Sequence, residues 1–547
     1  MVQKILNKIQ KNKFILNNNL FIFSIFNICF ILFCFYIIDQ FSEVLINRDF
    51  YRYFLIDGES HINLIWETNK NFNFEKIHYS GLYNNNYYIF SALIYKLFLS
   101  FFDNSYSAFG FSAITLNLIS IYIIFITSFL ICFRFSRSKL LSIGISLLLW
   151  NQSLINFSLT IYPDILQLAF IFLSIYFMTL KKNFRWLLSL FFCGLAFGVK
   201  AQGLLIFVYL ITIYIIHEFV KINLNNFKLV QCKDLILKTF FYCALFFLTF
   251  YFFNRINFLN LFDFYFSIAK SSNTNNEFNN AEIVYDFLKY LLRGENNFII
   301  LIFLISGGLF FSYYEKQNRL LLFLTCIFLF LFYFQLSNFN KLVQGPRYLF
   351  HFLPILVIII AISFNNVANF FTRKKFKIFQ SLIPVIILIY GTISFQETFS
   401  NTIVDFDYKT KIKNDPMIEG YNFFKKNIFS NKKDPLVCSG MYSMVPKNFS
   451  KKIRKAYQHL YFEKKIMNKE CDFILLDSST PGRYIWFKDD LKNLKIKEYK
   501  NLSDYTKLDG KDIIEKNQNL IIHLLKNPKS GYKVDFYNNK MIILSKK

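Results

Sequence analysis

Acidic and basic side chains that could together act on a phosphorylated substrate stand at four places in this chain. A carboxylate can take a proton from an attacking hydroxyl or amine, and Lys or Arg can stabilise a departing phosphate. Because a phosphate leaves without being protonated, one base with nearby cations suffices, unlike the acid and base pair of a glycoside hydrolase. The acids are Asp57, Glu59 and Asp164, and the cations are Lys200 and Arg347, the latter followed by Tyr348.

The elements that must position these residues are long apolar segments. The chain of 547 residues is 54% hydrophobic and 20% aromatic, which is more than soluble globular proteins contain. Residues 19–39 form an apolar run long enough for one helical crossing of a membrane. No small-residue cleavage site follows it, so we expect an uncleaved anchor with a cytosolic N-terminus.

Ten further spans are expected downstream, which gives an all-α polytopic membrane bundle of about 11 transmembrane helices. An odd number of spans places the two ends of the bundle on opposite sides of the membrane. The expected ranges are 107–133, 140–157, 163–180, 186–199, 203–217, 237–254, 297–314, 319–336, 348–366 and 379–395.

The loops expected on the cytosolic side are all basic, as the positive-inside rule requires. The formal net charge of +27 therefore does not indicate a nucleic-acid partner, because much of it lies in short loops between apolar runs. The sequence also lacks the phosphate-binding Gly-rich loop that a nucleotide-driven pump needs. The cations of these loops are Arg134, Arg137 and Lys139; Lys181, Lys182 and Arg185; Lys221, Lys228, Lys233 and Lys238; Lys316 and Arg319; and Arg373, Lys374, Lys375 and Lys377.

The expected domains are a membrane domain over 1–401, with a large first outer loop at 40–106, and a small extracytoplasmic α/β domain over 402–547. Cys438 and Cys471 in the second domain could form a disulfide outside the cytosol, and two unpaired buried thiols are the alternative. The expected elements are a helix near 417–429 and strands at 436–438, 473–476, 532–536 and 541–544, with a turn at Asn538-Asn539.

On this topology the four places carrying acids and cations share the outer face, and their order resembles the GT-C superfamily of glycosyltransferases. The similarity is to the bacterial branch related to dolichyl-phosphate-mannose-protein mannosyltransferases and to the aminoarabinose transferases of lipid A. The matching features are Asp57-Gly58-Glu59 after the first span, a Tyr-rich segment and helix at 83–98, Pro163-Asp164, a Gly-rich span ending at Lys200, and Arg347-Tyr348.

Three departures leave the subfamily and the sugar open. The adjacent Asp-Glu of the family is separated here by Gly58. A Pro pair expected near Tyr87 is missing, and the family's Lys-Gly-Pro is replaced by Lys200-Ala201-Gln202-Gly203.

The resemblance implies an inverting sugar transfer from a polyprenyl-phosphate donor to a glycan, lipid or protein acceptor at the outer face of a membrane, in bacteria the inner membrane. Asp57 would be the general base, with Glu59 and Asp164 orienting acceptor or base. Lys200, Arg347 and Tyr348 would bind the donor phosphate. The family implies no certain cofactor. A divalent metal ion on Asp57, Glu59 and Asp164 is compatible with carboxylate chemistry, and His61 and His78 share that loop.

Simpler interpretations stand beside each assignment. Asp57 and Glu59 could be a solvated loop pair, Asp164 a helix cap and Lys200 a residue reaching the interface. Arg347 could be an interfacial anchor. A transporter or flippase for lipid-linked saccharides would use the same charges to line a pathway, although no internal repeat supports it. A membrane scaffold working through its C-terminal domain is the third class.

Overall fold

The computed structural model describes the elements that carry Glu59, Asp164 and Lys200, three of the six predicted site residues. The residues described are 27–28, 30–45, 58–71, 84–98, 105–149, 152–181, 184–221, 229–254, 306–310, 318–337, 350–373, 377–428, 435–439, 466–477, 520, 522–538 and 541–547. The chain divides into two compact units, one of residues 1–38 and 60–405 and one of residues 39–59 and 406–547.

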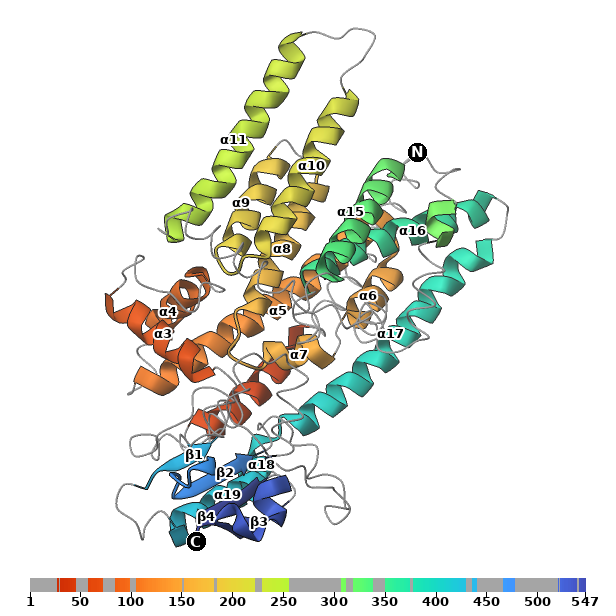
Figure 1. Ribbon diagram of the computed structural model, residues 1–547. Helices are drawn as coiled ribbons and strands as arrows, with labels where there is room; N and C mark the ends of the chain where they lie inside the picture. Colours follow the sequence, from red (N-terminus) through yellow and green to blue (C-terminus); the bar gives the residue numbers. More distant parts are fainter. Residues whose placement is uncertain are drawn as a thin grey trace. The chain divides into compact units, whose positions relative to one another are not determined.

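The first unit is helical throughout its described part (Figure 1). Five of its helices are long and apolar enough to cross a membrane, with candidate spans Ser107–Ser136, Gly203–Val220, Cys232–Phe253, Phe350–Phe370 and Leu382–Val404. Its helices are α3 (Gly58–Asn71), α4 (Asn86–Phe98), α5 (Ser105–Ser136), α6 (Lys139–Leu148), α7 (Gln152–Ser158), α8 (Asp164–Thr179), α9 (Arg185–Phe197), α10 (Gly203–Lys221), α11 (Leu229–Phe253), α15 (Arg319–Ser337), α16 (Leu353–Arg373) and α17 (Lys377–Asp405).

Four shorter apolar helices accompany these five in the described part of the chain, so the expected 11 full spans are met only in part. The span predicted at 140–157 is wrong as one helix, because α6 ends at Leu148 and α7 begins at Gln152. Polar residues interrupt the apolar run there. Helix α6 instead lies tightly on α17, where a Cβ on Gly144 would come within 2.9 Å of the Ile387 backbone.

Helices α8 and α9 form an antiparallel hairpin that fixes two ends of the bundle. Asp164 begins α8, and Lys200 lies just after α9, so both are at one end. Thr179 ends α8 and Arg185 begins α9 at the other end. A helix of 16 residues is about 24 Å long, which is close to the thickness of the apolar part of a bilayer.

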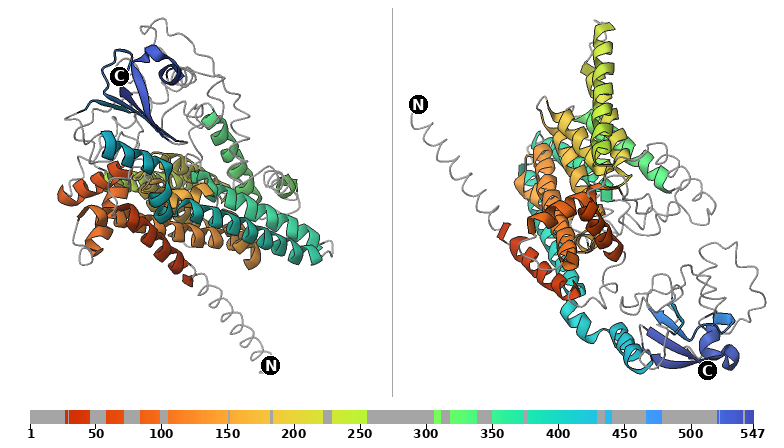
Figure 2. Two further views of the ribbon diagram at one scale, coloured as in Figure 1. Left: turned by 90° about the horizontal axis from the view of Figure 1, so that it is seen from below. Right: turned by 90° about the vertical axis from the view of Figure 1, so that its left-hand side faces the viewer.

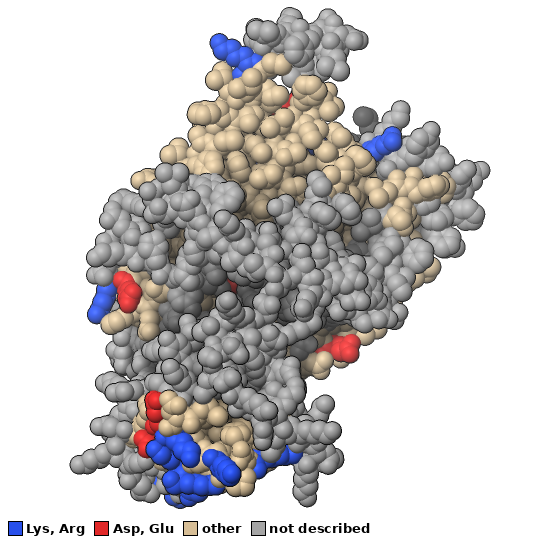
Figure 3. Space-filling model, viewed as in Figure 1, with Lys and Arg blue, Asp and Glu red and all other residues tan. Residues whose placement is uncertain are grey.

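The described surface over α9, α10 and α11 is almost entirely uncharged on the face shown in Figure 3. Large apolar side chains are exposed on these helices, among them Val208, Phe219, Phe240 and Phe252. Helices that expose apolar side chains in this way need a lipid surround, since water would leave them unfavourably solvated. Together with the apolar helices, this indicates an integral multi-pass membrane protein.

The second unit contains a four-stranded sheet of order β1-β2-β4-β3. Strand β1 (Val437–Ser439) pairs in parallel with β2 (Phe473–Asp477), and β4 (Met541–Lys546) pairs antiparallel with β2 and β3 (Tyr532–Tyr537). All four lie within a residue or two of the strands predicted at 436–438, 473–476, 532–536 and 541–544. Asn538 accepts a hydrogen bond from the Met541 backbone N–H at 2.8 Å, which closes the predicted turn.

Figure 2 shows the strands of this sheet from two further sides. Side chains of alternate strand residues form two apolar layers on its opposite faces. On one face α19 (Pro416–Phe423) packs through Met417 and Tyr421. On the other face lie Leu520, Leu524 and the disulfide between Cys438 and Cys471. Cys438 and Cys471 therefore form the predicted disulfide and are not two free thiols.

Candidate active site

A buried ion pair lies at one end of the α8–α9 hairpin. Lys200 Nζ is 2.5 Å from Asp164 Oδ1, and the two side chains are only 4% and 3% exposed. Burying two charges costs several kcal/mol for each unless they are paired. Such a pair in an apolar helical bundle is a candidate for function, because ionisable groups inside membrane proteins are rare and usually mark substrate or ion sites.

The simpler interpretations of this pair meet different outcomes. Asp164 is the acid in the first turn of α8, as the helix-start interpretation expected, but no side chain forms a capping hydrogen bond at Pro163, the N-cap. The Asp164 carboxylate turns to Lys200 instead. Lys200 does not reach out to an interface, since its side chain is buried against that carboxylate.

The turn that carries Lys200 is held by hydrogen bonds from its neighbours. Gln167, one helical turn after Asp164, donates from Nε2 to the Lys200 backbone oxygen at 2.7 Å. The Lys200 N–H donates to Ala196 O at 3.1 Å, which ends α9. These bonds fix the backbone of Lys200, from which its buried side chain reaches Asp164.

Three consecutive asparagines brace the same end of α9. Asn84 and Asn86 donate from their backbone N–H groups to Val199 O and Gly198 O at 2.9 and 3.1 Å. The Asn86 amide donates to Leu195 O at 3.0 Å and accepts from Asn254 Nδ2 at 3.0 Å. The segment before α4 thus satisfies the free carbonyls at the end of α9 and ties them to α11.

An aromatic and polar wall lies beside Asp164. Tyr87, Tyr88 and His61 are fully buried, and His61 Nδ1 is 3.1 Å from the Tyr88 hydroxyl. The ring of Tyr162, two residues before Asp164, is centred 5.6 Å from that of His61. Asn117 of α5 donates from Nδ2 to Thr160 O at 2.6 Å, shortly before Tyr162. Helices α3, α4, α5 and α8 therefore contribute to one polar region.

Three oxygens of this region, Asp164 Oδ2, the Tyr87 hydroxyl and Asn117 Oδ1, have no hydrogen-bond partner among the described residues. Asp164 Oδ2 is buried, and no described residue donates to it, whereas Oδ1 is taken by Lys200. A buried carboxylate oxygen without a donor is costly, and in native proteins it is normally satisfied by water or a bound hydroxyl. Asp164 can therefore accept one more hydrogen bond from a molecule that enters.

The other residues predicted for the site lie at the edge of the description or beyond it. Asp57, Arg347, Tyr348 and His78 are outside the described residues. Glu59 is the second residue of α3, and its side chain is not described. Of the residues predicted to act together, the structure thus joins Asp164 and Lys200 directly.

A metal ion finds no ready ligand set among the residues described. No group of three or more His, Cys, Asp or Glu side chains there could hold an ion. Asp164 already binds the Lys200 ammonium group, so a divalent cation on the same oxygen would have to displace Lys200. His61 lies against the rings of Tyr87, Tyr88 and Tyr162. The predicted metal site on Asp57, Glu59 and Asp164 includes two side chains outside the description, so it stays a prediction.

Several residues of this region were not singled out by the sequence reasoning. Gln167 is a polar residue within an apolar helix, which is a usable signal. The run Asn84-Asn85-Asn86 reads as an ordinary helix start, and its bonds to α9 and α11 require the tertiary structure. Asn117 and Asn254 likewise become meaningful only through their partners.

Comparisons with known proteins give matches of general layout. No family model matches the chain, and no curated protein matches it. The crystal structure of ArnT from Cupriavidus metallidurans bound to undecaprenyl phosphate matches with a TM-score of 0.47 and 11% identity, covering 94% of this chain and 97% of that one. An Archaeoglobus fulgidus oligosaccharyltransferase, in complex with Zn and sulfate, matches with a TM-score of 0.43 and 13% identity, covering 78% of this chain and 65% of that one.

Both matched proteins are GT-C glycosyltransferases, the superfamily that the sequence resembles. At these identities and TM-scores the similarity concerns the arrangement of elements, and no activity follows from it.

Proposed function

We propose that this protein is an integral membrane glycosyltransferase that moves a sugar from a polyprenyl-phosphate carrier to an acceptor on the extracytoplasmic side. The observation that carries the proposal is the buried Asp164–Lys200 pair in an apolar helical bundle. A fixed, buried cation suits the phosphate group that must take up negative charge as the sugar leaves. The order of motifs along the chain supplies the reaction class.

In the proposed reaction, Asp57 takes the proton of the acceptor hydroxyl or amine. The acceptor atom forms a bond to the anomeric carbon while the bond from that carbon to the phosphate oxygen breaks. The electron pair stays on the polyprenyl phosphate, whose charge Lys200 and Arg347 stabilise, with Tyr348 beside them. The configuration at the anomeric carbon is inverted, because there is one displacement.

The ion pair assigns Asp164 a positioning role within this scheme. Its carboxylate holds the Lys200 ammonium group in place, and its second oxygen is available to a hydroxyl of donor or acceptor. Glu59 would orient the acceptor. No step of the scheme needs a metal ion. A divalent cation, if bound, would act on the donor phosphate or on the carboxylates of Asp57 and Glu59.

Short stretches of chain connect two further residues of the proposal to described neighbours of Asp164. Asp57 precedes His61 by four residues, and the His61 ring contacts Tyr162. Arg347 precedes Phe350 by three, and the Phe350 ring is centred 5.8 Å from Phe157, which in turn contacts Tyr162. A common site for Asp57, Arg347 and Asp164 is part of the proposal.

The disulfide of the second unit supports the proposed topology, with a cytosolic N-terminus and residues 402–547 outside. Disulfides persist in oxidising compartments and are rare in the cytosol. The pair Cys438 and Cys471 is buried in the sheet core, whereas six described cysteines elsewhere are free. The cellular side can be tested by labelling introduced cysteines in that unit in intact cells.

The function is tested with the purified full chain in lipid nanodiscs. The protein is given a panel of polyprenyl-phosphate-linked pentoses and hexoses together with membrane-lipid, glycan and peptide acceptors, and released polyprenyl phosphate is measured. We expect acceptor-dependent release that Lys200→Gln lowers at least tenfold and that the exposed control Lys233→Gln leaves unchanged. Movement of the intact donor across a bilayer without release would instead favour a flippase.

A further inference from the structure

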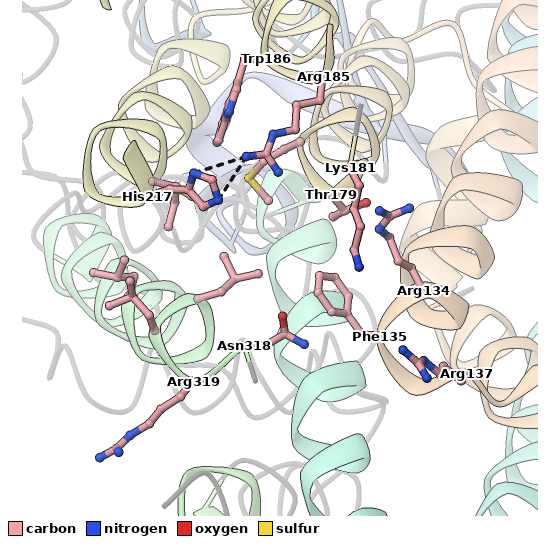
Figure 4. A pocket seen from close by; sticks show the side chains of 15 residues that line it. Arg134, Phe135, Arg137, Thr179, Lys181, Arg185, Trp186, His217, Asn318 and Arg319 are labelled. Atoms are coloured by element: carbon pink, nitrogen blue, oxygen red, sulfur yellow. Dashed lines mark hydrogen bonds between the residues drawn. The ribbon is translucent and has the colours of Figure 1, made fainter. Parts of the chain in front are cut away.

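A polar cavity lies at the opposite end of the α8–α9 hairpin from the Asp164–Lys200 pair. Its volume is about 380 Å³, and it is formed by the ends of α5, α8, α9, α10 and α15 (Figure 4). Five of its lining residues are cations, namely Arg134, Arg137, Lys181, Arg185 and Arg319. No acidic residue lines it in the described part of the chain. This cavity is called the basic pocket below.

The basic pocket is partly preorganised. Arg185 donates from Nη1 to Leu180 O at 3.3 Å and from Nη2 to His217, whose Nε2 is 3.2 Å away. His217 Nδ1 is 2.9 Å from Glu218 Oε1. These contacts agree with a neutral His217 that donates from Nδ1 to Glu218 and accepts from Arg185 at Nε2. The Arg185 guanidinium group is therefore held by partners on both sides.

Two other cations of the pocket have no counter-charge among the described residues. Neither Arg134 nor Lys181 forms a hydrogen bond or ion pair with a described residue, and both line the same cavity as Arg185. The acid beside Arg185, Glu218, is bonded to His217 and does not line the cavity. Figure 4 shows Arg134 and Lys181 on one side of the pocket facing Arg185, whereas the Arg319 head points away. Like charges held together without an acid are unfavourable unless an anion joins them.

The backbone at this pocket is also unusual. Arg137, directly after α5, has φ of 56°, and Asn318, directly before α15, has φ of 63°. Only three described residues other than glycine have a positive φ, and two of them line this cavity. A left-handed conformation in a residue such as Arg is unfavourable, and such residues concentrate at binding sites.

We propose that the basic pocket binds the phosphodiester headgroup of an anionic glycerophospholipid of the cytosolic leaflet. Arg134, Lys181 and Arg185 contact the phosphate oxygens, with Arg185 suited to bidentate contact. The apolar remainder of the lining, Trp186, Ile213 and Leu324 among it, faces the glycerol and the start of the acyl chains. The position at helix ends favours a lipid over a soluble phosphate compound.

Native mass spectrometry of the detergent-solubilised full chain tests this proposal. Phosphatidylglycerol is titrated in, with phosphatidylcholine as the neutral lipid, and bound lipid is counted. We expect preferential retention of phosphatidylglycerol, and we expect the double variant Arg134→Gln/Lys181→Gln to bind it about tenfold more weakly. The matched control Lys233→Gln/Lys238→Gln removes two cations from α11 outside the pocket and should bind as the unchanged chain does.

A charge-retaining variant and a competition with a soluble phosphate distinguish lipid binding from other causes. The charge-retaining variant Arg134→Lys/Lys181→Arg should keep binding within about twofold, which shows that loss in the Gln variant is not a folding defect. Glycerol phosphate at millimolar concentration should not displace the lipid. Equal lipid retention by the two Gln double variants, or full displacement by glycerol phosphate, would overturn the assignment to a lipid headgroup.

Discussion

Removing one or both partners of the Asp164–Lys200 pair separates the structural contribution of the pair from its catalytic one. At an effective dielectric constant of about 20, charges roughly 3 Å apart attract by about 6 kcal/mol. Desolvating two ions offsets much of this, so the pair itself adds little net stability. Removing one partner is different, because it leaves a buried charge without compensation and should cost about 3–5 kcal/mol.

We therefore expect Lys200→Met and Asp164→Asn each to lower the free energy of unfolding by about 3–5 kcal/mol. The double variant Asp164→Asn/Lys200→Met contains neither charge and should recover most of that loss, giving a coupling energy of at least about 2 kcal/mol. Transfer activity should not recover with it, because the phosphate still lacks Lys200. Loss of one such electrostatic contact typically lowers kcat about 100-fold or more.

The assay combines equilibrium unfolding of the purified chain in detergent with the release of polyprenyl phosphate. Stability losses of the single variants that add in the double variant within about 0.5 kcal/mol would contradict the pairing. A stable double variant with full activity would refute the role of Lys200 at the phosphate.

Three further predictions concern other parts of the chain. Gly198→Ala should lower the free energy of unfolding by about 1–3 kcal/mol, because the added Cβ would overlap the Asn86 side-chain amide, which two hydrogen bonds hold in place. The control Gly307→Ala adds a Cβ that meets only an ordinary contact at 3.6 Å. Equal melting temperatures for the two variants would contradict this. Replacing Cys438 and Cys471 by Ser should destabilise the sheet unit by about 3–4 kcal/mol, since the bond closes a loop with a sequence separation of 33, and unchanged protease resistance of that unit would argue against it. Burial lowers the pKa of His523 below its usual 6.5, so the unfolded chain binds a proton that the folded one does not; stability of this unit should fall as pH drops below about 6.5 and stay level above it, and His523→Gln should remove that slope in pH-dependent unfolding.

Local patterns carried much of the fold. Short apolar runs located the four strands, and the Asn538 turn between the last two followed from its residue types. The apolar run at 140–157 misled, because length and hydropathy do not reveal a break at its polar residues. Tight packing of Gly144 on α17 accounts for where α6 lies, and that contact joins segments more than 200 residues apart.

The sequence predicted the residues of the candidate site but not their contacts, because those contacts join distant segments. Residue chemistry selected Asp164 and Lys200 separately, and the α8–α9 hairpin brings them together. Their mutual pairing, on which the proposed positioning role of Asp164 rests, depends on side-chain geometry that spacing cannot give. The positive-inside pattern likewise identified the cations of the basic pocket as loop charges, whereas their gathering around one cavity follows from the ends of five helices meeting.

The central claim is that a carboxylate at Asp57 drives sugar transfer from a lipid-phosphate donor. The most direct measurement compares polyprenyl-phosphate release by Asp57→Asn with release by Glu67→Gln, which changes an exposed carboxylate of α3 in the same way. Both variants should insert and fold as the unchanged chain does. We expect Asp57→Asn to lower the rate of polyprenyl-phosphate release by at least about 100-fold and Glu67→Gln to leave that rate unchanged. An Asp57→Asn protein that transfers sugar at the normal rate would contradict the assignment of Asp57 as the base.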